Sequence, residues 1–392
     1  MTGFAAARKT LIASGLLVLA GCQIVPGSGR RAEAPVPTPP PRQARPDAPP
    51  VPLRPAERHQ VALLVPLSGP NAGVGTSIQN AARLALSDAN EQRIELKVYD
   101  TAQAGAAAVA QQALAGGARL FLGPLTADDA RVIGPIARRS GVPVIAFSND
   151  RQVAGDGVYV LGFTPEQSIR RVVSHARRQG AQRFAALIPT GEYGERARVA
   201  FRDAVTDAGG RLAGVAFFDR APAQIAAAAA RVAGGPPADA VLIADTGGTA
   251  KIAAPALKRG PLRAARILGT ELWGNEASLG RTPALAGARF AAVPDAVFDQ
   301  LVRRYRAQTG RTPYRLGSLG YDATLLAIRV ARDWNVGAPF PAGRLTDRGG
   351  FSGVDGAFRF RRDGTAERSL AIIEVTPAGE QVVDAAPTTF GD

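Results

Sequence analysis

The sequence predicts an α/β protein of two lobes, each a parallel β-sheet covered by helices on both faces. From residue 60 onward, short apolar runs alternate with amphipathic helical segments, and this alternation runs through two successive series. Strands that are apolar throughout are typical of parallel sheets with right-handed helical crossovers. The chain has 392 residues, 46% of them hydrophobic, which is enough for two cores.

The first element along the chain is a secretion signal, expected over residues 1–21. Arg8 and Lys9 precede an apolar run over residues 11–18, and Leu-Ala-Gly leads into Cys22. The run is too short to span a bilayer as a mature helix, and it ends in small residues that a peptidase can cleave. Cys22 is the only cysteine, so it has no disulfide partner within the chain.

The residues 19–22 resemble the bacterial lipobox, whose cysteine is acylated and becomes the new N-terminus. This resemblance implies a periplasmic lipoprotein held in the membrane by lipid on Cys22, since several acyl chains anchor stably where one is marginal. In such lipoproteins a non-acidic residue after the cysteine, here Gln23, implies passage to the outer membrane.

A proline-rich spacer follows, so that residues 22–58 form the lipidated cysteine and its tether. Proline removes backbone donors and favours extended polyproline II, at about 3 Å per residue. The spacer therefore gives the folded part a reach of roughly 100 Å at most. An SH3-type ligand is the alternative, which the irregular proline spacing disfavours.

The folded part begins near residue 60 with a series expected to form the first lobe. Hydrophobic periodicity separates its strands from its helices. The strands are expected at 61–65, 94–99, 120–122 and 144–147, and the helices at 78–89, 106–114 and 128–139.

A second series of the same kind follows residue 164 and is expected to form the second lobe. Its strands are expected at 184–188, 214–218, 240–244 and 266–269, and its helices at 168–178, 195–208, 224–232 and 249–257. Two later helices are expected at 297–308 and 321–333, and residues 357–360 with 370–375 suggest a terminal β-hairpin. Because ligands of open parallel sheets bind beyond the carboxyl ends of the strands, two facing lobes predict a site in the cleft between them.

Several motifs at these strand ends resemble those of the leucine/isoleucine/valine-binding protein family, which implies the type I periplasmic-binding-protein fold. They are Pro66-Leu67-Ser68-Gly69-Pro70, Leu122-Gly123-Pro124-Leu125-Thr126, Val144-Ile145-Ala146-Phe147-Ser148, Glu192-Tyr193-Gly194 and Gly320-Tyr321-Asp322-Ala323. The resemblance implies a first lobe of residues 59–164 and 295–340, a second lobe of 165–294 and 341–377, and a tail of 378–392. With a lipobox and a spacer, the whole resembles the penicillin-binding protein activator lipoproteins.

A ligand-binding set follows from the same resemblance: Ser68, Thr126, Ser148, Tyr193, Asp245 and Glu271. In that family the positions of Thr126 and Ser148 hold an amino-acid head group, and the free amides of a helix start support this. The alternative is an ordinary N-cap. Tyr193 matches a tyrosine that closes over the ligand, and Asp245 loosely matches an acid for its ammonium. Trp273 suits the cleft and the core equally.

The sequence offers little for catalysis. With only two histidines, histidine-based zinc sites and a Ser-His-Asp triad are nearly excluded. We find no P-loop and no nucleophile elbow, and we expect no cofactor. Loop carboxylates leave a cell-wall hydrolase as a third, disfavoured class. The formal charge of +14 suits an acidic partner, or reflects arginines spread over solvated helix faces.

These observations predict a binding protein rather than an enzyme. The expected partner is a penicillin-binding protein, a cell-wall synthase, reached through the peptidoglycan layer, with no role for nucleic acid. The alternative is the substrate-binding lipoprotein of an amino-acid ABC importer, whose partner is a permease. An amino acid or a cell-wall peptide is the expected ligand, unless the cleft is vestigial.

Overall fold

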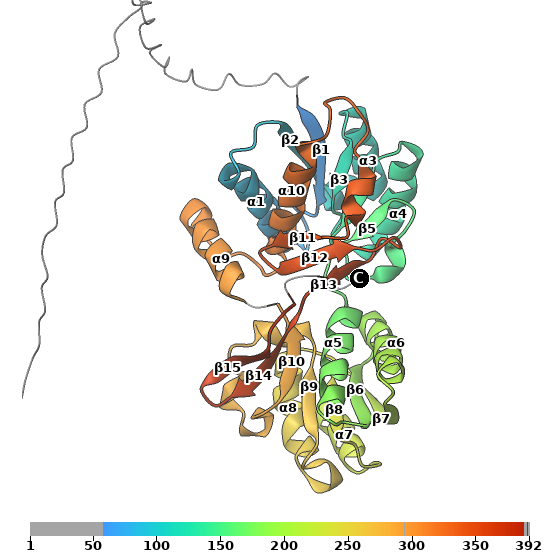
Figure 1. The fold of residues 1–392 in the computed structure, drawn as a ribbon, viewed down its shortest axis with the longest axis vertical. Coiled ribbons are helices and arrows are strands. Elements are labelled where there is room, and N and C mark those ends of the chain that lie inside the picture. Colours follow the sequence, from blue (N-terminus) through green and yellow to red (C-terminus); the bar gives the residue numbers. More distant parts are fainter. Residues whose placement is uncertain (1–57, 294, 388–389, 391–392) are drawn as a thin grey trace, which may run out of the picture. The chain divides into compact units, whose positions relative to one another are not determined.

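The computed structural model describes residues 58–293, 295–387 and 390 (Figure 1). The expected signal peptide, the lipidation site Cys22 and the spacer up to residue 57 lie outside these residues, and they stay predictions. Within the described part, the chain forms the two lobes that the alternation of strands and helices predicts, and the α/β fold class with parallel sheets is confirmed.

The first lobe is built on a five-stranded parallel sheet in the order β2-β1-β3-β4-β5. Its central strands β1, β3 and β4 are buried except at Gln60 in β1, so their continuous apolar runs match a sheet covered on both faces. The strands are β1 (His59–Val65), β2 (Ile94–Asp100), β3 (Leu120–Leu122), β4 (Val144–Ala146) and β5 (Val158–Val160).

Helices cover both faces of this sheet. Helices α1 (Ala72–Asp88) and α10 (Gly317–Ala331) pack on one face, and α3 (Ala106–Ala115) and α4 (Ala127–Arg139) pack on the other. Helix α9 (Asp295–Thr309) lies against α1 through Leu301 and Tyr305. The short helix α2 (Thr101–Ala104) and the 3-10 turn η2 (Arg151–Val153) complete the lobe's loops.

The second lobe is built on a seven-stranded sheet in the order β15-β14-β10-β9-β8-β6-β7. Five strands run parallel, and β14 and β15 join antiparallel at one edge. The strands are β6 (Arg183–Pro189), β7 (Arg211–Phe218), β8 (Ala240–Ile243), β9 (Arg266–Gly269), β10 (Arg289–Ala292), β14 (Ala371–Thr376) and β15 (Gly379–Asp384).

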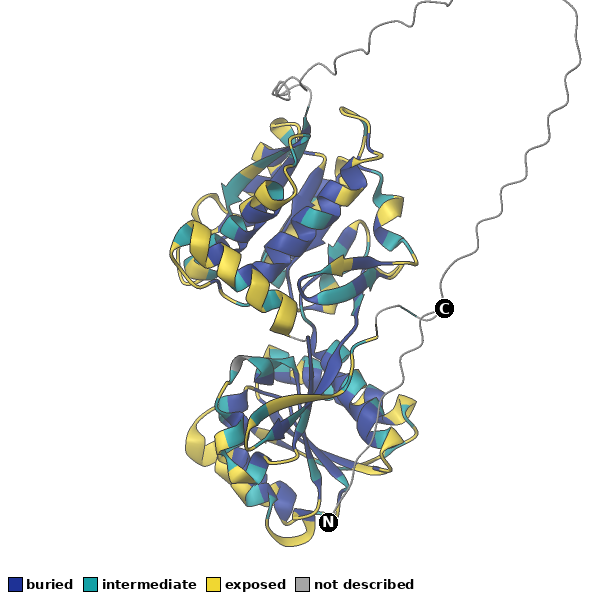
Figure 2. Cartoon of the chain, turned by 60° about the vertical axis from the view of Figure 1, so that its left-hand side comes forward, coloured by how far each residue is buried: buried dark blue, intermediate teal, exposed yellow. Residues whose placement is uncertain are grey.

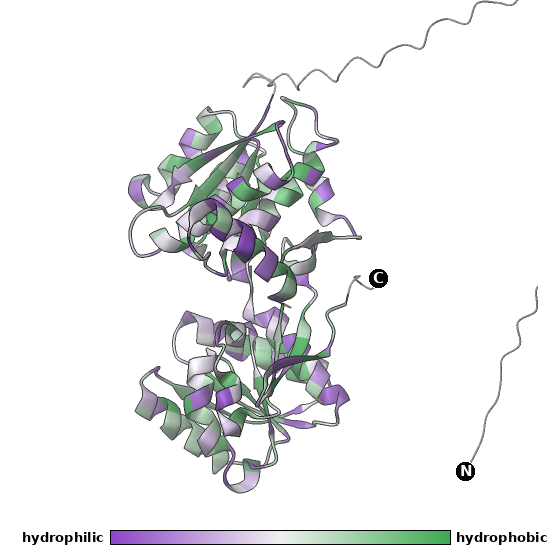
Figure 3. Ribbon diagram, turned by 90° about the vertical axis from the view of Figure 1, so that its left-hand side faces the viewer, coloured by the Kyte–Doolittle hydropathy of each residue, from purple (hydrophilic) through white to green (hydrophobic). Residues whose placement is uncertain are grey.

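Helices again lie on both faces of the sheet. Helices α5 (Pro165–Arg178) and α6 (Glu192–Asp207) pack on one face, and α7 (Pro222–Ala233) and α8 (Gly247–Leu257) on the other. Buried residues fill the interior of each lobe, and the outer helix faces are exposed and more hydrophilic (Figures 2 and 3). The 3-10 turns of this lobe are η3 (Gly260–Leu262), η4 (Glu271–Asn275), η5 (Leu279–Arg281) and η6 (Pro283–Leu285), whereas η7 (Ala342–Thr346) packs on the core of the first lobe through Leu345.

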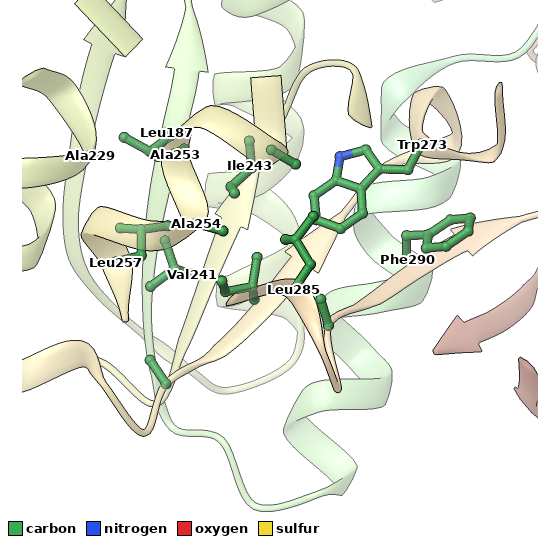
Figure 4. Close-up of a cluster of buried hydrophobic side chains, with 14 of the residues drawn as sticks. Leu187, Ala229, Val241, Ile243, Ala253, Ala254, Leu257, Trp273, Leu285 and Phe290 are labelled. Carbon is green, nitrogen blue, oxygen red and sulfur yellow. The ribbon is translucent and has the colours of Figure 1, made fainter. Parts of the chain in front are cut away.

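Trp273 belongs to the core of the second lobe rather than to the cleft. Its side chain is fully buried, with its ring centroid 5.9 Å from that of Phe290 (Figure 4). Gly269 makes this possible, because a Cβ there would lie 2.3 Å from the indole ring. The sequence left open whether Trp273 lies in the cleft or in the core, and packing places it in the core.

The C-terminal region differs from the expected arrangement. The anticipated hairpin of 357–360 with 370–375 is not formed. Instead, β11 (Phe351–Gly353), β12 (Gly356–Phe360) and β13 (Ala366–Arg368) make a separate antiparallel sheet. A short turn, in which Arg361 N donates to Thr365 O, brings β13 rather than β14 against β12.

This pairing moves the lobe boundary. Phe351, Phe358 and Phe360 pack into the core of the first lobe, whereas residues 341–377 were expected in the second. The chain enters the second lobe only at β14, and β15 extends that sheet where a tail of 378–392 was expected. The physical reason is burial: β14 is apolar on both faces and fits inside a sheet.

Each lobe uses one glycine to bring the helix that follows its first strand close to the end of that strand. A Cβ on Gly194 would lie 1.6 Å from the carbonyl oxygen of Pro189, and a Cβ on Gly75 would lie 1.7 Å from that of Pro66. Only glycine permits this approach. Both strand-end loops are therefore held close to their sheets, at the edge where ligands of this fold class bind.

Candidate functional site

A cleft of about 510 Å³ is lined by residues of both lobes. The first lobe contributes the residues that follow β3 and β4, and the second lobe contributes the start of α6 and the turn η4. The polar and charged wall residues are Thr126, Asp128, Asn149, Glu192, Tyr193, Arg196, Glu271, Asp295 and Arg315. The volume lies in the range of small-molecule sites.

The structure brings three of the six predicted residues to this cleft. Thr126, Tyr193 and Glu271 line its wall. Ser68 is exposed in the loop before α1, outside the wall. Ser148 and Asp245 are buried and also lie outside the wall, as described below.

Thr126 caps helix α4, as the alternative interpretation held. Its hydroxyl accepts a hydrogen bond from the amide of Asp129 at 3.2 Å. Two carboxylates, Asp128 and Asp129, occupy the first turn of the helix and interact favourably with its dipole. A ligand carboxylate at this helix start would meet these like charges, so the local electrostatics disfavour an amino-acid head group here.

The other two head-group candidates are engaged in internal hydrogen bonds. The Ser148 hydroxyl accepts from the amide of Asp150 at 3.0 Å. The Asp245 carboxylate accepts from Arg220 Nε at 3.0 Å, from the Thr246 amide at 2.9 Å and from the Thr249 hydroxyl at 3.2 Å. Because three donors already serve Asp245, its carboxylate has little capacity left for a ligand ammonium.

Tyr193 and Glu271 are two partly buried polar residues on the wall of the second lobe. The Tyr193 hydroxyl donates to the Thr270 hydroxyl at 3.5 Å, and burial raises the pKa of Tyr193 well above its usual range. Burial also raises the pKa of Glu271 to about 7, and a hydrogen bond from Ser168 opposes that rise. Near neutral pH, therefore, Glu271 can carry a proton and donate a hydrogen bond into the cleft.

An ion pair joins the two lobes across the cleft, and the sequence did not indicate it. Arg196 on α6 lies 3.3 Å from the carboxylate of Asp150 in the first lobe and donates to the side-chain oxygen of Asn149 at 3.4 Å. Asp150 is 2% exposed and also pairs with Arg131 at 2.6 Å. The only feature of the sequence that pointed to a paired Arg196 was its spacing from Glu192. Glu192 lies one helical turn earlier on the same face of α6.

Arg315 forms a second charged feature of the wall that the sequence did not indicate. Its Nη1 lies 2.9 Å from the carboxylate of the fully buried Asp355, and its guanidinium stacks 3.9 Å from the ring of Phe298. The cleft thus carries two arginines that are already partnered by protein groups.

In the described part of the chain, no group of three or more histidine, cysteine or acidic side chains is placed to hold a metal ion. None of the described helices is long and apolar enough to cross a bilayer.

Comparison with known proteins gives a family match over most of the chain. A family model described as periplasmic binding protein matches residues 59–380. A stretch of 167 residues is 25% identical to an uncharacterized protein of Rickettsia prowazekii, covering 42% of this chain and 45% of that protein. A stretch of 117 residues is 30% identical to the penicillin-binding protein activator LpoA of Klebsiella pneumoniae, covering 30% of this chain and 16% of that protein. The matches thus span less than half of either relative.

Solved structures share the fold. A putative branched-chain amino acid ABC transporter protein from Rhodospirillum rubrum aligns with a TM-score of 0.69 at 21% identity, covering 83% of this chain and all of that one. The C-domain of LpoA from Haemophilus influenzae, described as a regulator of PBP1A, aligns with a TM-score of 0.66 at 21% identity, covering 83% of this chain and 99% of that one. At this identity the likeness extends to the fold alone.

Proposed function

This chain belongs to the periplasmic binding protein family, and on that premise we propose that it is a tethered envelope lipoprotein that activates a penicillin-binding protein in cell-wall synthesis. It acts by binding, without catalysis of its own. The proposal combines the family membership with the lipobox at Cys22 and the proline-rich spacer. It places the folded part in the periplasm, anchored by lipid to the outer membrane.

The observation that carries the proposal is the state of the expected amino-acid site. Thr126 caps a helix whose first turn carries Asp128 and Asp129, and Ser148 and Asp245 lie outside the cleft wall. A transport protein needs groups on the cleft wall that attract the head group of its cargo, because a charged head group requires strong partners once it leaves water. Their arrangement supports a protein whose two lobes serve as a scaffold for a protein partner.

The spacer supports the same function. A polyproline-like chain contributes mainly reach, and roughly 100 Å is useful to a protein anchored in one membrane whose partner lies beyond the cell wall. The chain's relatives whose names state a role include an activator of a penicillin-binding protein. That role belongs to the relative and enters here as a proposal.

The test is stimulation of a purified synthase. The lipidated full-length protein, in detergent, is added to the penicillin-binding proteins of the same organism, one at a time, and glycan polymerisation and cross-linking are followed. We expect one synthase to polymerise or cross-link severalfold faster. If none responds while calorimetry detects tight binding of an amino acid, the activator proposal is wrong.

A test in cells compares a shortened spacer with a scrambled spacer of full length. Deleting about twenty residues within 26–58 removes roughly 60 Å of maximum span, whereas scrambling the same residues removes little. In a deletion strain under β-lactam stress, the scrambled version should complement and the shortened version should not. Equal complementation, at equal protein level and lipidation, would count against the reach argument.

The second candidate function is the substrate-binding lipoprotein of an amino-acid ABC importer. The cleft favours it, because its volume of about 510 Å³ and its partly buried Tyr193 and Glu271 suit a small polar ligand. A Glu271 that carries a proton near neutral pH suits a neutral hydrogen-bonding group of a ligand better than an ammonium. Calorimetry with amino acids and cell-wall peptides distinguishes the two functions.

A further inference from the structure

A second pocket lies beside the segments that connect the lobes, separate from the cleft. It has a volume of about 260 Å³. Residues from both lobes line it: α5 contributes one wall, and η2 with the β12–β13 hairpin contributes the other. We call it the arginine pocket, after the six arginines on its wall: Arg151, Arg170, Arg171, Arg178, Arg361 and Arg368.

The wall of this pocket is rich in arginine. Among the residues that line it, the six arginines face only two carboxylates, Glu166 and Glu367. Two further carboxylates pair with these arginines: Asp207 with Arg170, and Asp384 with Arg171 and Arg178. The charges of three further carboxylates act on these arginines: Asp363 on Arg151 and Arg361, and Asp322 and Asp355 on Arg368. Because six arginines and only two carboxylates line one concave surface, the wall favours an anion.

A buried arginine on the wall, Arg368, has two nitrogen atoms without a hydrogen-bond partner among the described residues. Arg368 is 7% exposed, and its Nη2 donates to the carbonyl oxygen of Leu161 at 2.7 Å. Its Nε and Nη1 make no hydrogen bond with any described residue. A buried charged donor without an acceptor is costly, so two such donors on one guanidinium indicate an acceptor that the protein itself does not supply.

The surroundings of Arg368 hold this guanidinium in place. Its Cζ lies 4.6 Å from the ring centroid of Phe163 and 5.3 Å from that of Phe358. The buried carboxylates of Asp322 and Asp355 interact with its charge without a hydrogen bond to it. Because the guanidinium is fixed between two rings, its unbonded edge is pre-organised, which reduces the entropy lost on binding.

We propose that the arginine pocket is a binding site for a small phosphate-bearing anion. Arginine forks match phosphate oxygens in paired hydrogen bonds, and the wall presents six arginines beside two carboxylates. The volume is below the usual range for drug-sized ligands, which limits the ligand to inorganic phosphate, pyrophosphate or a short phosphate ester. Phe163 lines the cleft, and its ring also lies against the Arg368 guanidinium, so this residue contacts both the cleft and the arginine pocket.

Calorimetry on the full-length protein tests this site with three probes: inorganic phosphate, pyrophosphate and glycerol 3-phosphate. We expect saturable binding of at least one probe at low ionic strength. Tighter binding of glycerol 3-phosphate than of phosphate assigns the site to phosphate esters, and the reverse order assigns it to free phosphate. Succinate serves as the carboxylate comparison, and succinate binding as tight as the best phosphate probe overturns the assignment to phosphate.

Matched variants locate the binding. The double variant Arg151→Gln, Arg361→Gln removes two exposed guanidinium groups from the wall and should weaken binding at least about tenfold. The control Arg202→Gln, Arg344→Gln removes the same charge from two exposed arginines outside the pocket and should bind like the wild type. Equal losses in both doubles would show nonspecific attraction and overturn the site, as would no saturable binding by the wild type.

Arg368 needs a second measurement, because its replacement can disturb the fold. Arg368→Met keeps much of the apolar stem between the two rings, and near-ultraviolet circular dichroism checks that the native packing is retained. A folded variant that binds as tightly as the wild type contradicts the role of Arg368. If Arg368→Met unfolds, the two double variants still decide the proposal.

Discussion

Replacing Glu271 with glutamine should change the pH dependence of the second lobe's stability. Burial raises the pKa of Glu271 to about 7, against an ordinary value of 4.5. A carboxyl whose pKa is higher in the folded chain than in the unfolded chain holds its proton longer when folded. The free energy of unfolding of the wild type therefore falls as the pH rises from about 4.5 to about 7. Glutamine cannot ionise, so Glu271→Gln removes this loss.

The magnitude follows from the size of the shift. One pKa unit corresponds to about 1.4 kcal/mol, so the full shift is worth about 3 kcal/mol. Because the side chain borders the water of the cleft, screening reduces the expected effect to about 2 kcal/mol. Below pH 4.5 the residue is protonated in both the folded and the unfolded chain. The difference in the free energy of unfolding between wild type and Glu271→Gln then no longer depends on pH. We therefore expect the stability of Glu271→Gln relative to wild type to increase by about 2 kcal/mol between pH 4.5 and pH 7.5.

The two tryptophans allow this effect to be measured in one lobe. Trp273 lies in the core of the second lobe, and Trp334 packs in the first, against His59. In a Trp334→Phe background, tryptophan fluorescence reports on the second lobe alone. Urea unfolding of this background, with and without Glu271→Gln, is followed at half-unit steps of pH from 4.5 to 8.

A neighbouring glutamate provides a control of opposite sign. The hydrogen bond from Ser278, with Lys251 beside it, lowers the pKa of Glu276 below its ordinary value. Its ionised form therefore stabilises the folded state above pH 4.5, and this stability is lost as the pH falls through the lowered value. Glu276→Gln should reduce stability at pH 7. If the pH profile of Glu271→Gln runs parallel to that of wild type, Glu271 is not held protonated, and the reasoning about its burial is wrong.

Three further predictions concern other parts of the chain. Arg196→Gln breaks the ion pair between the lobes and leaves Asp150 with one arginine partner; we expect a loss of about 1–2 kcal/mol and faster hydrogen exchange around residue 150. Gly194→Ala should lower the melting temperature, with a cost of at least about 2 kcal/mol, because its Cβ would overlap a carbonyl oxygen; Gly214→Ala, where the space is open, should cost less than half as much. Cys22→Ala should leave the protein unprocessed or release it from the membrane fraction, and unchanged mass and fractionation would exclude lipidation at this residue.

The sequence alone determined the two-lobed α/β fold, because the signals are local. A strand buried on both faces must be apolar at every position, and a crossover helix must be amphipathic, so each element carries its own evidence. Parallel strands also place their carboxyl ends at one edge of a sheet, which explains why Thr126, Tyr193 and Glu271 reach the cleft as expected. The order of the first lobe's motifs likewise indicated where ligand-facing loops lie.

The direction of individual side chains was decided by tertiary structure. Ser148 and Asp245 also follow strand ends, but each bonds to a nearby amide or arginine and lies outside the cleft wall. The residue type and position are the same for a ligand contact and for an internal hydrogen bond. Only the surrounding donors distinguish the two, and those donors come from packing.

Contacts between distant segments also could not be predicted from the sequence. β13 and β14 both follow β12, and the spacing along the chain allowed either of them to pair with it. The turn at residues 361–365 and the burial of β14 in the second sheet decided that β13 is the partner. Arg196 and Asp150 meet across two lobes, and the six arginines of the arginine pocket come from three separate segments. Local patterns fix which elements form, whereas the charges that face one another depend on how those elements pack, because electrostatic contacts join residues whose separation in sequence is arbitrary.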